Sequence, residues 1–285
     1  MEKVSLYIPC YNAERYIKEC LDSVMNQSYK IDEIMVIDDG STDRTVDIAK
    51  NYPAKIIKNR ENKGLAACRN IAFREAKNEF VAALDADCVA SPEWLAQLMQ
   101  RFVNDDIAGV GGILIERHTT SRADKWRSVH MAQQWGPELL ENPPFLYGNN
   151  NVFNKYCIKA VGLYNENFRT NYEDVDLSVR LYKSGFRLIY NPEALVEHLR
   201  RDTIRSALET YWHWKYYKYM HPNYINKLSQ RMIMRLRSIA EYDGIFKDFF
   251  MQDLRERNYK LLLLDFICVF YCLWLDLREI AKEFF

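Results

Sequence analysis

The chain has 285 residues, of which 48% are hydrophobic and 27% charged, and its formal net charge is zero. This composition is ordinary for a folded protein and excludes an intrinsically disordered chain. The length suits one large domain with an appendage, or two small domains. The charge is uneven, because residues 200–237 contain nine basic residues against two acidic ones. Such a segment favours an anionic partner, phospholipid or nucleic acid, or is an ordinary solvated helix face.

The seven cysteines form no C-x-x-C pair, and none lies near histidines with the spacing of a zinc site. An odd number of unpaired cysteines favours a reducing cytosol. The chain enters an apolar strand almost at once, without a secretory signal peptide. These features predict a cytoplasmic protein.

Strand and helix patterns alternate through the first hundred residues. Short apolar runs typical of buried parallel strands occur at residues 4–8, 33–37, 55–58 and 80–84. Helical patterns follow Asn12, cover 65–76 and begin again after Ser91, which is a good N-cap before Pro92. The alternation predicts an α/β fold with a mostly parallel sheet flanked by helices.

The second half of the chain is less regular. A strand is predicted over 109–116, a helix over 174–183, and two short strands over 186–190 and 195–198. From about residue 203 the strand signal ends and the remainder is helical. The boundary between an α/β domain and a helical region is therefore predicted near residue 200.

Two acidic pairs follow predicted strands: Asp38 with Asp39, and Asp85 with Asp87. Open α/β sheets bind ligands at the carboxyl ends of their strands. Two like-charged pairs in one crevice are costly unless a cation relieves the repulsion, and Mg²⁺ or Mn²⁺ bridging to a diphosphate would do so. The alternative is that each aspartate caps the following helix, which is disfavoured for Asp85 and Asp87 because the next helix has its own cap at Ser91.

Known phosphate-binding loops are missing. The chain contains neither G-x-x-x-x-G-K-[ST] nor G-x-G-x-x-G. Charge on a bound phosphate must therefore be neutralised by a metal and by basic side chains.

Five segments occur in a specific order over roughly residues 3–198. They are VSLYIPCYNAERYIKECLDSVMNQSY, EIMVIDDGSTDRT, NKGLAACRN, FVAALDADC and GLYNENFRTNYEDVDLSVRLYKSGFRLIYNPEALVEH. Together they resemble a family 2 glycosyltransferase with the GT-A fold. The resemblance implies a Rossmann-like catalytic domain over 1–200, with a nucleotide-sugar half over 1–103, an acceptor half over 104–200 and a helical extension over 201–285.

The resemblance also implies a nucleotide-sugar site. In such enzymes Pro9 and Tyr11 would line the nucleotide base, and Asp39 would accept a hydrogen bond from the N3–H of uracil or thymine. Arg69 would lie close to the base and phosphates. Asp85, the first aspartate of the D-x-D pair, would lie near the ribose and the metal.

The same resemblance implies the chemistry. Asp87 would bind Mn²⁺ or Mg²⁺ directly, and His198 would complete the metal or diphosphate site. Glu173 and Asp174 match the family's E-D motif, in which the aspartate is the general base of an inverting transfer. A carboxylate at a helix N-terminus is expected to stay ionised. The alternatives are a helix-start acid for Glu173 and a structural histidine for His198.

Gly148, Asn149 and Asn150, followed by Asn151, resemble the family's acceptor-side loop. Consecutive asparagines suit a loop with unusual backbone angles, and they could equally bind sugar hydroxyls. The residues alone do not separate these two roles.

The Q-x-x-R-W motif of processive synthases is missing, and so are clear membrane spans. The expectation is therefore transfer of a single sugar, with a UDP-sugar favoured, to a glycan or lipid-linked acceptor hydroxyl. Two other functions remain open. One is a nucleotidyltransferase that makes a nucleotide sugar, and the other is a non-catalytic sugar- or lipid-binding relative.

The C-terminal region is expected to contact a membrane through residues 205–275, with no nucleic acid as partner. Residues 211–220 are rich in Trp, Tyr and Lys, as at a lipid headgroup boundary. Residues 261–275 are apolar apart from Asp265, but 15 residues fall short of the roughly 20 that span a bilayer. The alternative is a helix packed on the catalytic domain or on a second subunit of a homo-oligomer. Docking would place the protein on the cytoplasmic face of the membrane.

Overall fold

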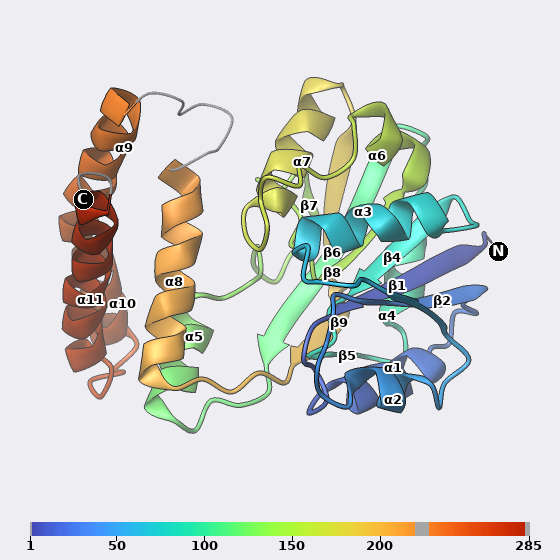
Figure 1. Ribbon diagram of the computed structural model, residues 1–285, viewed down its shortest axis with the longest axis horizontal. Coiled ribbons are helices and arrows are strands. Elements are labelled where there is room, and N and C mark those ends of the chain that lie inside the picture. The colour runs from blue at the N-terminus through green and yellow to red at the C-terminus, as the bar shows by residue number, and fades with distance from the viewer. Residues whose placement is uncertain (1, 220–227, 283–285) are drawn as a thin grey trace. The chain divides into compact units, whose positions relative to one another are not determined.

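The computed structural model describes residues 2–219 and 228–282. It divides into two compact units, which Figure 1 shows in ribbon form. The first unit comprises Met1–Arg117 and Gln133–Arg200, and the second comprises His118–Ala132 and Arg201–Phe285. The first unit is α/β, and the described elements of the second are helices.

The first unit contains nine strands and six helices among its described residues. The strands are β1 (Val4–Cys10), β2 (Glu33–Asp38), β3 (Lys55–Lys58), β4 (Phe80–Leu84), β5 (Cys88–Ala90), β6 (Ile107–Glu116), β7 (Leu140–Glu141), β8 (Asn150–Asn154) and β9 (Arg187–His198). The helices are α1 (Ile17–Met25), α2 (Thr45–Ala49), α3 (Leu65–Glu75), α4 (Trp94–Met99), α6 (Lys155–Ala160) and α7 (Glu173–Lys183).

All nine strands belong to one sheet with the order β3-β2-β1-β4-β8-β6-β9-β5, and β7 pairs with β9. Parallel pairing joins β3, β2, β1 and β4 in turn, and also joins β6 to β9. The sheet is mixed because β5, β7 and β8 run antiparallel to their neighbours. The predicted α/β fold, with helices flanking the sheet and helices at the C-terminus, is confirmed.

Helices cover both faces of the sheet (Figure 1). On one face α1, α2 and α4 share a single apolar cluster with β1, which includes Ile17, Leu21 and Trp94, and α4 packs on β9 and β6. On the other face α3 packs on β1 and β2, α6 packs on β8 and α7 packs on β9, with Phe73 and Leu177 in a second apolar cluster. Burying one such side chain contributes roughly 1.5–3 kcal/mol. The sheet lies between these two apolar layers, and polar residues follow the carboxyl ends of β1, β2 and β4.

Local structure differs from the sequence prediction at three places. The first helix begins at Ile17 rather than after Asn12, because Asn12 takes a left-handed backbone (φ 50) and accepts a hydrogen bond from the Thr42 N–H at 2.9 Å. The two short strands predicted over 186–190 and 195–198 are one strand, β9, whose register with β6 shifts between Gly112 and Ile113. Strand β8 replaces the loop that was expected at the asparagine run.

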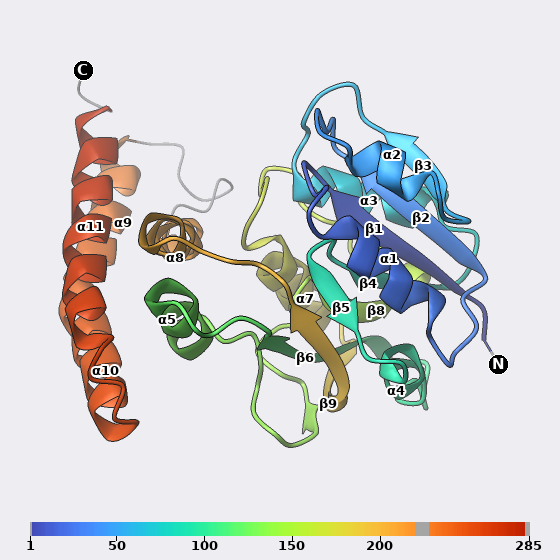
Figure 2. The same cartoon turned by 90° about the horizontal axis from the view of Figure 1, so that it is seen from below.

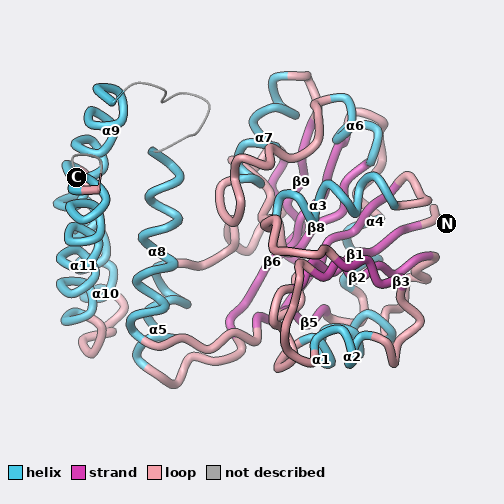
Figure 3. The backbone as a smooth tube through the Cα atoms, viewed as in Figure 1, coloured by secondary structure: helices cyan, strands magenta, loops and turns pink. Residues whose placement is uncertain are grey.

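The second unit is a bundle of α5 (Arg122–His130), α8 (Ile204–Tyr219), α9 (Leu228–Ala240), α10 (Tyr242–Arg255) and α11 (Leu262–Ala281). Figure 2 shows α5 beside α8, and Figure 3 shows the helical character of the bundle. The division differs from the boundary placed at residue 200, because residues 118–132 belong to this unit. Their physical tie is Trp126, which is 1% exposed in the apolar core that α8, α10 and α11 share.

The bundle corrects part of the membrane hypothesis. Trp212, Lys215 and Arg235 are buried in it, and the Lys215 ammonium lies 3.5 Å from the centre of the Tyr242 ring. These side chains therefore do not form a headgroup-facing surface, and Met220 of the predicted aromatic segment lies outside the described residues. Among the described residues, none of the helices combines the length and the apolar character needed to cross a membrane.

One apolar face remains on α11. The helix directs Leu264, Cys268, Cys272 and Leu275 into the core of the bundle. Its outer side carries exposed apolar side chains at Leu263, Phe266, Ile267, Phe270, Trp274 and Leu277. The segment 261–275 is thus half buried in protein, and Asp265, the one charged residue in it, is buried on the core side.

Candidate active site

The D-x-D pair lies where β4 ends and the chain turns into β5. The Asp85 backbone N–H donates to the Asn149 carbonyl at 3.3 Å, which ties this turn to the start of β8. The two side chains stay partly open to solvent, with 25% of Asp85 and 32% of Asp87 exposed. Burial raises the pKa of Asp85 to about 6, although the Arg69 guanidinium opposes this shift. Both side chains are therefore accessible to a ligand, and the charge of Asp85 is incompletely neutralised by the protein.

His198 stands between Asp87 and a third carboxylate, Glu116. Strand pairing places His198 opposite Cys88 of β5 and opposite Glu116 of β6. Its Nε2 lies 3.2 Å from Asp87 Oδ2, and its Nδ1 lies 3.0 Å from Glu116 Oε1. Burial alone would lower the pKa of His198, but the two carboxylates outweigh it and raise the pKa to about 9. Attraction to His198 likewise outweighs burial at Asp87 and lowers the pKa of that carboxyl.

Arg69 of α3 is buried next to the D-x-D turn and the E-D motif, with 1% of its surface exposed. Its guanidinium lies 3.7 Å from Asp85 Oδ1 and 3.5 Å from Glu173 Oε1, and it donates a hydrogen bond to the Gly148 carbonyl. Because its charge is already shared between two carboxylates and its surface is covered, a direct contact with nucleotide phosphates is disfavoured. Arg69 instead links α3 to the three segments that contain Asp85, Gly148 and Glu173.

Asp174 lies in the first turn of α7, which follows Tyr172, and the left-handed backbone of Tyr172 (φ 74) turns the chain into the helix. Its Oδ2 accepts a hydrogen bond from the Gly148 N–H at 3.2 Å. Burial raises the pKa of Asp174, although Arg69 and the N–H groups of Val175 and Gly148 oppose the shift. This differs from the expectation of a fully ionised carboxylate, because desolvation outweighs the helix N-terminus.

Glu173, the neighbour of Asp174, is 3% exposed. Burial and the charge of Asp174 raise the pKa of Glu173 to about 7, against the attraction of Arg69. Two adjacent carboxyls that resist ionisation together are typical of sites that exchange protons.

The residues expected to bind the nucleotide lie at the carboxyl ends of β1 and β2. Asp39 is 4% exposed and accepts hydrogen bonds from Asn59 Nδ2 at 2.8 Å, from the Lys63 N–H at 2.9 Å and from the Gly64 N–H at 2.8 Å. Pro9 is buried in β1, whereas Tyr11 just beyond it is 52% exposed. Asp39 therefore fixes the loop that leads into α3.

The asparagine run divides into two roles. Asn150 is 1% exposed in β8, where its Oδ1 accepts from Trp94 Nε1 at 2.6 Å and its Nδ2 donates to the Ile113 carbonyl at 2.9 Å. Its amide is thus engaged in structure, which disfavours an acceptor contact. Asn149 donates to Gln133 Oε1 at 2.6 Å, and its own Oδ1 has no hydrogen-bond partner among the described residues.

The structure therefore brings Asp85, Gly148, Glu173 and Asp174 together around Arg69, and Asp87 with His198. Asp39 and Tyr11 occupy the neighbouring strand ends. Glu116 was missed by the sequence analysis, and only its register opposite His198 reveals it.

Comparisons with known proteins agree with this arrangement. The model of "Glycosyl transferase family 2" matches residues 5–162. EpsE of Bacillus subtilis (strain 168), described as a glycosyltransferase, is 30% identical over 214 residues, which cover 70% of this chain and 74% of EpsE. The poly-beta-1,6-N-acetyl-D-glucosamine synthase of Staphylococcus epidermidis is 29% identical over 216 residues, and the match spans 72% of this chain and about half (52%) of that protein.

Solved structures share the fold. The mannosyltransferase PcManGT from Pyrobaculum calidifontis, in complex with GDP-Man and Mn²⁺, superposes with a TM-score of 0.65 at 17% identity, covering 96% of this chain and 88% of that one. GalNAc-T7 with UDP, GalNAc and Mn²⁺ gives a TM-score of 0.60 at 17% identity, covering 84% and 54%. The fold and the D-x-D turn define a GT-A glycosyltransferase. The chain belongs to glycosyltransferase family 2 and is an enzyme that transfers a sugar from a nucleotide sugar.

Proposed function

We propose that this family 2 enzyme is an inverting, metal-dependent glycosyltransferase that transfers one sugar from a nucleoside diphosphate sugar, with UDP favoured, to an acceptor hydroxyl. The observation that carries the proposal is the position of Arg69. It contacts Asp85 of the D-x-D turn, Glu173 of the E-D motif and the carbonyl of Gly148, whose N–H holds Asp174. The donor end and the candidate base are thereby fixed relative to each other.

The metal would be held by Asp87, Asp85 and His198. Two carboxylates and one imidazole suit Mn²⁺, and the carboxylates suit Mg²⁺. The fit is supported at Asp85, whose buried Oδ1 has no hydrogen-bond partner among the described residues and meets Arg69 only at 3.7 Å. When bound, such an ion neutralises charge on the departing diphosphate. Mn²⁺ accompanies the sugar nucleotide or nucleotide in both structural neighbours, which favours it here.

Asp174 is proposed as the general base. The acceptor oxygen attacks the anomeric carbon from the side opposite the diphosphate, its proton passes to Asp174, and the carbon–oxygen bond to the nucleoside diphosphate breaks with inversion. A carboxyl whose pKa is raised is a stronger base at neutral pH than an ordinary aspartate. Glu173 and Arg69 position it. The Gly148 N–H fixes the orientation of its Oδ2.

The nucleotide would bind across the carboxyl ends of β1 and β2. Tyr11 is exposed and offers a ring on which a base can stack. Oδ2 of Asp39 accepts one hydrogen bond, from Gly64, so it retains a lone pair for the N3–H of uracil. Pro9 is buried in β1, so it would shape the surface that lies under the nucleotide base.

The acceptor would approach past Gly148 and Asn149, whose Oδ1 is unpartnered. A glycan or a lipid-linked sugar is the proposed acceptor, and transfer stops after one sugar because the Q-x-x-R-W motif is missing. Docking on the cytoplasmic face of a membrane is proposed through the exposed apolar side of α11 rather than through the aromatic segment of α8, in which Trp212 and Lys215 are buried. A second copy of the chain is the other partner that this face would suit.

The test is a panel of UDP-, GDP- and dTDP-sugars with Mn²⁺ and lipid-linked or oligosaccharide acceptors. The expected result is release of nucleoside diphosphate and one added sugar by mass spectrometry, with UDP-sugars preferred. A nucleotidyltransferase would instead form a nucleotide sugar and pyrophosphate from a sugar phosphate and a nucleoside triphosphate. A non-catalytic relative would bind a sugar nucleotide without releasing diphosphate. A long product ladder from a single encounter would contradict single-sugar transfer.

A further inference from the structure

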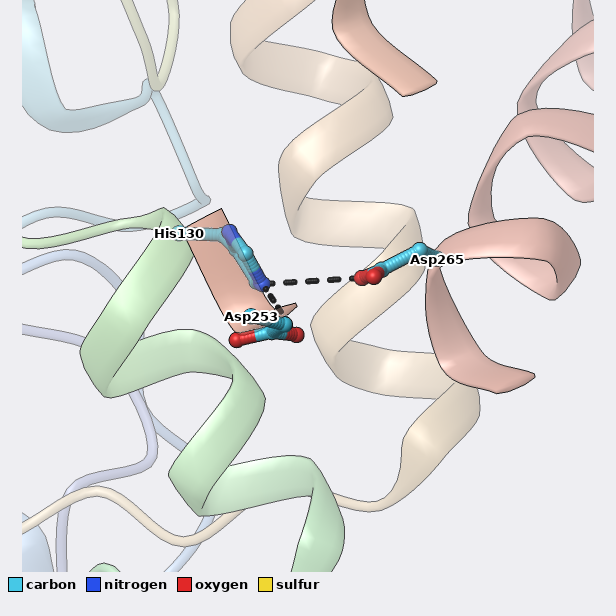
Figure 4. A group of neighbouring side chains, drawn as sticks. All are labelled: His130, Asp253 and Asp265. Atoms are coloured by element: carbon cyan, nitrogen blue, oxygen red, sulfur yellow. Dashed lines mark hydrogen bonds and ion pairs between the residues drawn. The ribbon is translucent and has the colours of Figure 1, made fainter. Parts of the chain in front are cut away.

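A second cluster of metal-binding side chains lies inside the helical unit and shares no residue with the candidate active site. Figure 4 shows His130 at the end of α5 facing Asp253 of α10 and Asp265 of α11. The Nε2 atom of His130 lies 3.1 Å from Asp253 Oδ2 and 3.5 Å from Asp265 Oδ1. All three side chains are fully buried. One donor atom from each residue lies within 4.8 Å of the others.

The charge of this cluster is incompletely balanced by the protein. In the part of the chain that the structure describes, the two aspartates make ion pairs with His130 alone. Asp253 also lies in the last turn of α10, where the negative end of the helix dipole disfavours a carboxylate. Buried charges in proteins are paired or coordinate metals, because an isolated one is very costly. One imidazole cannot neutralise two carboxylates.

An independent sign points to a missing ligand. Oδ2 of Asp265 is buried and has no hydrogen-bond partner among the described residues, although Oδ1 of the same carboxyl accepts from Trp126 Nε1 at 3.0 Å. The carboxyl group points toward His130 and Asp253 (Figure 4). The indole holds the carboxyl in place, and Asn258 Nδ2 does the same for Asp253 at 3.2 Å. Both carboxylates are thus oriented by neighbours, and Oδ2 of Asp265 is left without a partner among the described residues.

The spacing of the donor atoms also fits an ion. Ligands at about 2.0–2.1 Å from a tetrahedral zinc ion are separated from one another by roughly 3.3–3.5 Å. The two separations from His130 Nε2 bracket this value. We propose that His130, Asp253 and Asp265 bind a Zn²⁺ ion in a structural site that ties α5 to α10 and α11. The fourth position would belong to a water molecule.

The site would explain how α5 is retained in the helical unit. His130 is separated from its two partners by 123 and 135 residues along the chain, and α5 is inserted from the middle of the α/β sequence. Because a metal site forms only when its ligands converge, binding an ion contributes directly to folding. The ion would therefore stabilise the junction between the inserted helix and the C-terminal helices.

The test uses the full chain with Asp87→Ala, which removes the proposed active-site metal ligand. The protein is stripped with a chelator, freed of it, and equilibrated with micromolar Zn²⁺ without nucleotide. Bound zinc is counted by mass spectrometry, and thermal unfolding is followed with and without zinc. We expect about one zinc ion per chain. The unfolding midpoint of the helical unit should rise by roughly 10–20 °C at zinc concentrations near 100 times Kd.

Adding Asp265→Asn to this variant keeps an oxygen for Trp126 but removes the anionic ligand. It should weaken zinc binding by at least about 100-fold, beyond the 10–100-fold typical of losing an outer-shell partner. The matched control is Asp276→Asn, also on α11 and buried, where the carboxylate accepts from Trp212 Nε1 at 2.9 Å but lies outside the cluster. That control should bind zinc with nearly unchanged affinity.

Two results would overturn the proposal. One is the lack of bound zinc in the folded Asp87→Ala protein, which would leave a shared proton as the neutraliser of the cluster. The other is equal zinc binding by Asp87→Ala with and without Asp265→Asn. If Asp265→Asn does not fold, Co²⁺ in the Asp87→Ala protein decides, since a tetrahedral site gives strong visible absorption and its lack refutes the site.

Discussion

Gly148 and Arg69 are in contact so close that no side chain fits between them. A Cβ atom on residue 148 would lie 2.5 Å from one guanidinium nitrogen of Arg69, a distance that carbon atoms do not tolerate. Arg69 cannot move aside easily, because it is buried and held by Asp85 and Glu173. The glycine that opens the asparagine run is therefore required by packing, whatever its role toward an acceptor.

We predict that Gly148→Ala lowers transfer by about 10²-fold, the scale of a displacement of catalytic groups by about 1 Å. The displaced Arg69 would shift both Asp85 and Asp174 through their shared contacts. Initial rates with saturating donor measure the effect. Gly244→Ala in α10 is the control, because nothing lies within 4 Å of its added Cβ. That change should leave activity intact and stabilise the helix by up to about 1 kcal/mol. Equal activities of the two variants would refute the role of Arg69 in positioning Asp85 and Asp174.

The proposed metal site predicts that diphosphate release requires Mn²⁺ or Mg²⁺ and is abolished by Asp87→Ala. The side chain is 32% exposed, so the substitution should leave the fold intact by circular dichroism. Asp43→Ala is a useful comparison, since that carboxylate hydrogen-bonds to Thr45 at the start of α2. It should reduce stability by about 1 kcal/mol without ending transfer. Full activity of the wild-type enzyme in excess chelator would contradict the proposed requirement for a metal.

Asp174→Asn is expected to retain binding of the nucleotide sugar and to lower transfer by about 10²–10⁴-fold. The amide keeps the shape and can still accept from the Gly148 N–H, but it cannot take a proton from the acceptor. Calorimetry of donor binding, together with single-turnover rates, separates the two effects. Near-normal transfer by this variant would indicate that Glu173 is the base instead. Glu173→Gln would then show the larger loss of transfer rate.

The acid limb of the pH–rate profile should lie above the pKa of an ordinary aspartate. The base must be ionised to act, and burial raises the pKa of Asp174 and raises the pKa of Glu173 to about 7. Transfer is therefore lost as the pH falls through the raised pKa of this pair and is restored as the pH rises above it. The rate at saturating donor between pH 5 and 9 tests this. A rate that stays constant down to pH 5 would show that a carboxyl with an ordinary pKa is the base.

Membrane docking through α11 predicts binding to anionic liposomes that depends on its outer apolar face. Phe270→Ser with Trp274→Ser should abolish co-sedimentation, because both side chains are exposed and together contribute several kcal/mol on leaving water. Val103→Ser, which is 72% exposed in the α/β unit, is the control and should bind as the wild type does. Negligible binding by every protein, with the double variant alone changing the mass in solution, would assign the face to a second copy of the chain.

The sequence alone determined the class of fold and most of the site. Apolar runs ending in Asp39 and in Asp85 specify parallel strands with acidic carboxyl ends, and Glu173 with Asp174 marks a helix start. These signals are local, because strand and helix periodicity and their flanking turns occupy only a few neighbouring residues. They were sufficient to predict the family and the order of its motifs.

The tertiary structure decided which side chains share an environment. Pairing of β5, β6 and β9 brings Glu116 to His198. Burial places Arg69, which was expected close to the phosphates, in contact with Asp85 and Glu173. The amide of Asn150 is used inside β8. Packing in the helical unit buries Trp212. It also brings together His130, Asp253 and Asp265, the proposed zinc ligands, from three helices. None of this is encoded by a local pattern, because desolvation and contacts between residues 80–140 positions apart depend on strand register and on which helix faces meet.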